Sequence, residues 1–136
     1  MTPAQLTDFA VRYTAAWCSH EPARVASSFA EQGSLTINHG APSVGRAAIT
    51  AAAQGFMSAF PDLVVIMDSL ETGPTIRYHW TLTGTNTGPG CTGRPVHISG
   101  YEEWTFGPDR LIDRSLGHFD EAEYQRQIQG TAGTTS

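Results

Sequence analysis

The sequence contains no lysine, and all eight of its basic residues are arginines spread along the chain. Without lysine there is no side chain for Schiff-base chemistry or for anchoring a pyridoxal-type cofactor. Charged residues make up only 15% of the chain, and the formal net charge is −5. This balance argues against a nucleic-acid partner, because a nucleic-acid-binding surface needs clustered basic residues.

Cysteine is also scarce. Cys18 and Cys91 stand far apart and form no CxxC pair, so neither a zinc site nor a disulfide framework is indicated. No two histidines have the spacing of a metal-binding motif, and no glycine-rich loop lies between a strand and a helix, so we expect no metal and no cofactor. The first residues show no secretory signal, and no apolar run is long enough to span a membrane. We therefore expect a cytoplasmic protein without membrane contact.

Helical patterns dominate the first sixty residues. Thr2, Pro3 and Gln5 have the pattern of a helix start with a capping box. The following apolar residues recur at helical spacing and include Leu6, Phe9, Ala10, Tyr13, Ala16 and Trp17. A shorter helix is predicted from Pro22, a strand over 34–40, and a third helix over 46–60. The apolar face of that third helix includes Phe56 and Phe60.

After residue 62 the apolar pattern alternates with a period of two. Four strands are predicted, over 63–71, 75–84, 95–106 and 110–119. A last helix is predicted to begin at Asp120, with Glu123 completing a capping box. The order ααβαββββα predicts a single α+β domain over 1–128, with helices on one face of a curved antiparallel sheet, and a disordered tail over 129–136. An apolar pocket between the sheet and the helices is the default functional site, and Phe56 and Phe60 are expected to contact a substrate there.

Several segments resemble one known superfamily. They are "FAEQGSLTINHG", "GRAAI", "HWTLTGTNTG", "YEEWTFGPDRLI" and "GHFDEAEYQRQ". With the order of elements, they make the chain similar to the nuclear transport factor 2-like superfamily and, within it, to the SnoaL-like group. The resemblance implies a cone-shaped, cystatin-like fold with an apolar cavity, a small apolar molecule as ligand and a homodimer. Because this fold hosts isomerases, dehydratases, cyclases, epoxide hydrolases and pure binding proteins, it does not fix the function.

The resemblance also implies roles for individual residues. Tyr13 matches the tyrosine that donates to an oxyanion in ketosteroid-isomerase-like members, and Trp17 on the same stripe is expected to line the pocket. Asn38 and His39 stand where isomerase-like members carry their base and epoxide-hydrolase-like members carry a water-holding asparagine. The alternation of the strand favours His39 as an inward-pointing base, with Asn38 as a substrate contact. The alternative for Tyr13 is a purely structural role in the core. The alternative for His39 is a histidine at the strand end that is hydrogen-bonded to the backbone.

Glu102 matches the isomerase position at which a neutral carboxylic acid helps to bind an oxyanion. It shares the apolar face of its strand with Trp104 and Phe106, whereas Glu103 is expected to point away. A carboxyl on an apolar face must raise its pKa or find a partner, since an unpaired buried charge is costly. The alternative is an ion pair with an arginine such as Arg77 or Arg114. Trp104 is predicted to be a substrate contact.

Two further positions depart from the family's patterns. His79 stands where the epoxide hydrolases carry an arginine, and we expect it to contact substrate. The general acid/base aspartate of SnoaL-like cyclases and of epoxide hydrolases falls on Gly117, and a glycine cannot transfer a proton. Asp113 or His118 could substitute for it only from a different position on the strand, and of the two we name His118 as the candidate catalytic group.

Three functions follow as hypotheses. The first is cofactor-independent acid/base catalysis of the isomerase, cyclase or dehydratase type on a small apolar carbonyl compound. The second is a non-catalytic binding or dimerisation module, and the third is an epoxide hydrolase-like enzyme. An open cavity in which Tyr13, Glu102 and a histidine converge favours an enzyme, whereas a filled cone with a salt-bridged Glu102 and an exposed His39 favours a structural role.

Overall fold

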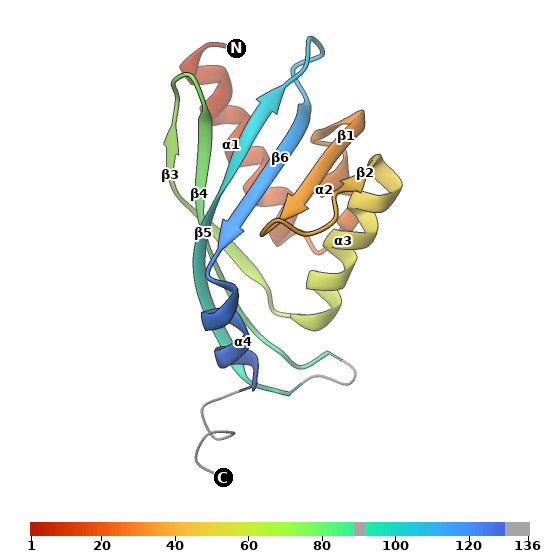
Figure 1. The fold of residues 1–136 in the computed structure, drawn as a ribbon, viewed down its shortest axis with the longest axis vertical. Coiled ribbons are helices and arrows are strands. Elements are labelled where there is room, and N and C mark those ends of the chain that lie inside the picture. Colours follow the sequence, from red (N-terminus) through yellow and green to blue (C-terminus); the bar gives the residue numbers. More distant parts are fainter. Residues whose placement is uncertain (89–91, 130–136) are drawn as a thin grey trace.

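The computed structural model describes residues 1–88 and 92–129 (Figure 1). Its elements, in chain order, are α1 (Pro3–Cys18), α2 (Pro22–Ala26), β1 (Phe29–Ile37), β2 (Ser43–Val44), α3 (Arg46–Ala59), β3 (Val64–Glu71), β4 (Ile76–Thr85), β5 (Pro95–Phe106), β6 (Ile112–Phe119) and α4 (Glu121–Gln129). The predicted α+β class and element order are confirmed, with the two-residue strand β2 added. Cys91 and all of the predicted tail except Gln129 lie outside the described residues.

The six strands form one curved sheet in the order β2-β1-β6-β5-β4-β3. The strands from β3 to β6 pair in antiparallel fashion, but β1 runs parallel to β6. The sheet is therefore mixed and not wholly antiparallel as predicted. Parallel pairing is available to β1 and β6 because most of the chain separates them, so no hairpin turn dictates their relative direction.

The predicted apolar stripe of α1 packs onto one face of the sheet. All six of its members are buried: Leu6, Phe9, Ala10, Tyr13, Ala16 and Trp17. The helix begins as predicted, since the Thr2 hydroxyl accepts from the backbone N–H of Gln5 at 3.1 Å and the Gln5 side chain accepts from that of Thr2 at 2.9 Å. Helix α3 buries Ile49, Ala53 and Met57 beside it. The core thus lies between these helices and what we call the inner face of the sheet. No helix in the described part of the chain is both long and apolar enough to cross a membrane.

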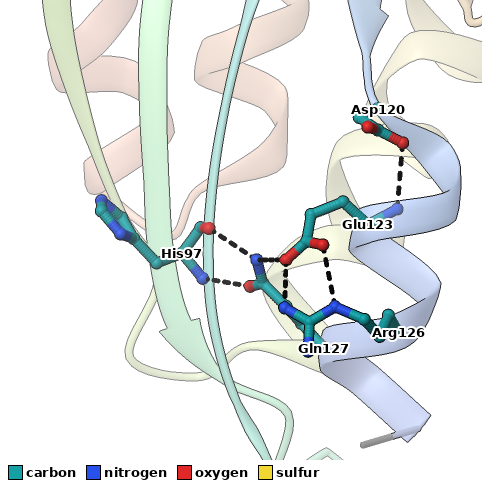
Figure 2. A network of polar contacts seen from close by, with 5 residues as sticks. All are labelled: His97, Asp120, Glu123, Arg126 and Gln127. Carbon is teal, nitrogen blue, oxygen red and sulfur yellow. Dashed lines mark hydrogen bonds and ion pairs between the residues drawn. The ribbon is translucent and has the colours of Figure 1, made fainter. Parts of the chain in front are cut away.

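Helix α4 contacts β5 through polar side chains (Figure 2), while its residues Tyr124 and Ile128 pack against the core. None of its residues is fully buried. The Gln127 side chain accepts from the backbone N–H of His97 at 2.7 Å and donates to the carbonyl of His97 at 2.9 Å. This contact satisfies backbone groups of β5 beyond Gly100, the point at which its pairing with β6 ends. Gln127 thereby fixes one end of α4 to the sheet.

The start of α4 differs in part from the predicted capping box. The Asp120 carboxylate accepts from the backbone N–H of Glu123 at 3.0 Å, as an N-cap does. The Glu123 side chain, however, turns toward Arg126 and Gln127 (Figure 2). These contacts lower the pKa of Glu123 to about 2, the hydrogen bond from Arg126 being the largest cause. The second half of the box is absent because a charged partner one turn away competes for the carboxylate.

Candidate active site: one buried carboxyl at an apolar cavity

A small cavity of about 60 Å³ lies between the inner face of the sheet and helices α1, α3 and α4. It is lined by Trp17, Leu35, Ile37, Phe56, Val65, Tyr78, Trp80, Leu82, Ile98, Glu102, Gly117, Phe119 and Tyr124. The volume exceeds the roughly 10–15 Å³ that one water molecule requires. It is far below the roughly 300–1,000 Å³ of sites for drug-sized ligands, so in this form the cavity suits a compact molecule. Among the described residues of this lining, Glu102 is the only one with an acidic or basic side chain.

Glu102 is held by three neutral hydrogen-bond donors. Its Oε1 accepts from the hydroxyls of Ser115 at 2.7 Å and Tyr13 at 2.9 Å, and from the indole N–H of Trp104 at 3.0 Å. Its Oε2 has a single contact among the described residues, a longer one of 3.2 Å to the Tyr13 hydroxyl. One carboxyl oxygen is thus fixed by the protein, and the other keeps capacity for a proton or a ligand.

The surroundings of Glu102 favour its neutral form. Only 8% of the residue is exposed, and no arginine of the described chain pairs with it. Burial is the largest influence and raises the pKa of Glu102, while the hydrogen bonds from Ser115, Trp104 and Tyr13 lower it without cancelling that effect. Burial likewise raises the pKa of Tyr13 well above the usual value of a phenol. Tyr13 therefore stays protonated and serves as a donor to Glu102.

Gly117 lies directly beside Glu102 on the inner face of the sheet. The two residues are partners in the pairing of β5 with β6. A β-carbon placed on Gly117 would lie 3.8 Å from Cγ of Glu102 and 3.5 Å from the carbonyl oxygen of Thr36, which are ordinary contact distances. The glycine is therefore not required by packing, and its effect is to leave the space beside Glu102 open.

Neither histidine proposed as a base reaches the cavity. His118 follows Gly117 and so points to the outer face of the sheet, where its Nε2 lies 3.0 Å from Oε1 of Glu103. His39 is exposed, and its ring lies 5.9 Å from that of His118. The expectation that His39 points inward is wrong, because β1 ends at Ile37 and the alternation does not continue beyond it.

Asn38 and His39 form a turn in which both residues have positive φ, of 49° and 64°. The Asn38 side-chain oxygen accepts from the backbone N–H of Phe119 at 2.9 Å, and its amide donates to Glu121 at 3.4 Å. Asparagine adopts this left-handed conformation more readily than most residues. Asn38 therefore joins the turn to the end of β6 and does not line the cavity.

His79 also lies on the outer face. Its neighbours Tyr78 and Trp80 line the cavity, so the alternation of β4 turns His79 away from it. The His79 Nε2 lies 2.6 Å from Oε1 of Glu71. The prediction that His79 contacts substrate does not agree with this placement, because the residue stands one position out of phase with the lining.

The remaining predicted contacts divide between the lining and the core behind it. Trp17 and Phe56 line the cavity. Phe60 is fully buried near Tyr124, and Trp104 is buried behind Glu102 as one of its donors. Tyr13 and Trp104 thus belong to the support of the carboxyl and not to the surface that a ligand touches.

Sequence reasoning missed Ser115, Trp80 and Tyr124. Ser115 and Gly117 share one face of β6, so extending the alternation of that strand would have placed the Ser115 hydroxyl inside. Tyr78, which lies two residues before Trp80 on the same strand, likewise indicates that Trp80 faces inward. Tyr124 reaches the cavity only through the docking of α4, which no local pattern predicts.

Within residues 1–88 and 92–129, no group of three His, Cys, Asp or Glu side chains is arranged to hold a metal ion.

Residues 10–114, well over half of the chain, match the SnoaL-like domain family. The chain belongs to the SnoaL-like family. No curated protein matches it. The solved structures that it resembles include a putative SnoaL-like polyketide cyclase from Jannaschia sp. CCS1, with 15% identity, a TM-score of 0.81 and 96% of each chain covered. A protein with a ketosteroid isomerase-like fold from Catenulispora acidiphila has 15% identity, a TM-score of 0.79 and 95% of each chain covered.

A third similar structure is SalBIII, an epoxide hydrolase/cyclase-like enzyme of pyran ring formation in salinomycin. It shares 16% identity with a TM-score of 0.76, over 90% of this chain and 97% of its own. At such identities the likeness concerns the fold alone. The chemistry of this SnoaL-like domain has to be argued from its own cavity.

Proposed function

We propose that this SnoaL-like domain catalyses cofactor-independent proton transfer on a compact, mostly apolar carbonyl compound, with Glu102 as both base and acid. The observation that supports it is a buried carboxyl, held by three neutral donors through one oxygen, at the wall of an otherwise apolar cavity. A raised pKa brings a carboxyl closer to neutral pH, where a group can take up and return a proton in one catalytic cycle.

The reaction is an isomerisation. The carboxylate form of Glu102 takes a proton from the carbon beside the carbonyl, and the electrons of that C–H bond form an enolate. The resulting carboxylic acid returns the proton to another carbon of the same conjugated system. Atoms and charge balance without a co-reactant. Because His39 and His118 lie outside the cavity, Glu102 carries out both transfers.

Tyr13, Ser115 and Trp104 act through Glu102. Their hydrogen bonds fix the carboxyl in one orientation and stabilise its charged form when the proton has left. They also lower the pKa of Glu102 from the value that burial alone would give. These three residues are positioning groups for a single catalytic carboxyl.

Non-catalytic binding of the same class of compound is the second candidate. It is favoured by Gly117, which stands where cyclases and epoxide hydrolases of the family carry an acid/base aspartate. A cavity with one carboxyl holds a carbonyl oxygen well, provided that the carboxyl is neutral and donates a hydrogen bond.

The two candidates are separated by proton exchange, which needs no knowledge of the natural substrate. Compact ketones such as cyclohexanone are incubated in D₂O, and NMR follows the exchange of protons beside the carbonyl. We expect the wild type to accelerate the exchange and Glu102→Gln to lower the enzymatic rate by about 10²-fold or more. Glu103→Gln, the matched variant on the outer face, should retain the wild-type rate. Ketone binding with no exchange above the buffer rate contradicts catalysis and supports the binding function.

A further inference from the structure

The cavity wall contains a second polar group that the proposed reaction has not used. Trp80 lies in the lining, and its indole Nε1 is buried without a hydrogen-bond partner among the described residues. The contrast with Trp104 is direct, since the indole of Trp104 donates to Glu102 at 3.0 Å. A buried donor without an acceptor is costly, and native structures seldom retain one without a reason.

The position of Trp80 is set by the backbone that it covers. Its partner on β5 is Gly100, and a β-carbon on Gly100 would lie only 2.8 Å from a ring carbon of Trp80. The same β-carbon would overlap with the carbonyl oxygen of His118. The glycine therefore lets the indole lie close over β5, which holds it against the cavity and limits its freedom to turn toward another acceptor.

Trp80 is also a near neighbour of Glu102. Tyr78 is the direct partner of Glu102 across β4 and β5, and Trp80 is two residues further along the same face. Residues placed diagonally across two strands in this way have Cα atoms roughly 7–8 Å apart, a distance that one compact ligand can span. Among the described lining residues, the other polar groups are the hydroxyls of Tyr78 and Tyr124 and the indole N–H of Trp17. The remaining ones are apolar side chains and a glycine.

We infer that the indole N–H of Trp80 binds the carbonyl oxygen of the ligand and places the adjacent carbon at Glu102. This assignment rests on the proposed function, because it assumes that Glu102 faces the reacting part of the ligand. It makes Trp80 the residue that selects for a carbonyl compound over a hydrocarbon of the same shape. In the proton-transfer reaction the same N–H stabilises the enolate oxygen, which carries more charge than the ketone oxygen.

The test compares two probes of nearly the same shape, cyclohexanone and methylenecyclohexane, which differ in having an oxygen acceptor or a CH₂ group. The chain has three tryptophans, so protein labelled with ¹⁵N in the indole gives at most three side-chain signals. Comparison with Trp80→Phe assigns the Trp80 signal. The Trp104 signal reports on Glu102, because the two side chains are hydrogen-bonded.

We expect cyclohexanone to move the Trp80 indole proton downfield and methylenecyclohexane to leave it without a downfield shift. Trp80→Phe should weaken cyclohexanone binding about tenfold, the loss of one ligand hydrogen bond, and change methylenecyclohexane binding less than twofold. The variant should fold, since the replaced N–H has no partner among the described residues and phenylalanine retains an apolar ring. Equal responses of the Trp80 proton to both probes overturn the inference.

The two proposals fail in different ways. A cyclohexanone response at Trp104 without one at Trp80 overturns the role of Trp80 and leaves Glu102 as the ligand contact. No response of either indole to saturating concentrations of cyclohexanone contradicts the proposed function and the role of Trp80 together. An unchanged cyclohexanone affinity in Trp80→Phe overturns the inference even when the spectra show binding.

Discussion

Glu102 and Glu103 are neighbours on β5 and have opposite surroundings. Glu102 faces the cavity, where its partners are the neutral groups of Tyr13, Ser115 and Trp104. Glu103 faces outward, where its partners are Arg77 at 3.6 Å and His118 at 3.0 Å. The two carboxyls are thus only one residue apart. Glu102 is buried, which raises its pKa, whereas Glu103 is partly exposed among basic groups. The comparison shows that the phase of a strand, and not the residue type, decides which of the two carboxyls faces the cavity.

The largest expected effect comes from removing each carboxyl in turn. Glu102→Ala leaves three buried donors without their acceptor and should lower the free energy of unfolding by about 3–5 kcal/mol. Glu103→Ala removes a partly exposed ion pair and should cost about 0–1 kcal/mol. Urea denaturation of both variants measures the difference. Equal losses would mean that the two carboxyls have similar energetic roles, against the present account.

Adding a carboxyl to the inner face tests the comparison from the opposite direction. Gly117→Asp places a second acid beside Glu102 and should cost about 1–3 kcal/mol at pH 7, because two buried carboxyls cannot both be charged there. Gly117→Ala is the matched control, and the available space predicts a change within about 1 kcal/mol. A well-tolerated aspartate would show that water reaches this wall freely.

The pH dependence of stability should distinguish the inner carboxyl as well. A carboxyl whose pKa is raised in the folded state binds more protons when folded than when unfolded, so its contribution declines as pH rises. The decline begins near the unfolded value of 4.5 and ends once the pH passes the folded pKa. Denaturation of wild type and Glu102→Gln across this range should show the extra loss in the wild type alone. Parallel curves would be evidence against a raised pKa.

The smallest effect is expected from the outer histidine. His118→Gln replaces a half-buried side chain that contacts Glu103 and no part of the cavity. It should change the free energy of unfolding by less than about 1 kcal/mol and leave cyclohexanone affinity within twofold of the wild type. A large loss of ligand affinity would place His118 in the site, as the sequence first indicated.

Strand phase also explains what the sequence predicts well. Glu102 follows from the alternation of Trp104 and Phe106 along an uninterrupted strand, and the α+β order follows from the change of period after residue 62. His39 does not follow in this way, because a strand pattern cannot show that β1 stops at Ile37 and turns through two residues of positive φ. His79 and His118 are predicted poorly for another reason. The resemblance places functional groups at His79 and next to His118, whereas the alternation of β4 and β6 turns both side chains away from the cavity.

Contacts between distant segments are the part that the sequence does not predict. The parallel pairing of β1 with β6 and the docking of α4 through Gln127 depend on the assembled sheet. The N–H of Trp80, which has no partner within residues 1–88 and 92–129, is likewise a property of the packed cavity, because it depends on which acceptors lie nearby. Local patterns predict the faces of elements, whereas partners across elements require the structure.

The central claim, that Glu102 is the raised-pKa carboxyl of the cavity, is tested most directly by NMR titration of its side-chain carboxyl carbon. Protein labelled with ¹³C-glutamate gives the signal, and Glu102→Gln assigns it. The account predicts a titration midpoint for Glu102 clearly above 4.5, the usual value of a glutamate. A midpoint at or below 4.5 would contradict it.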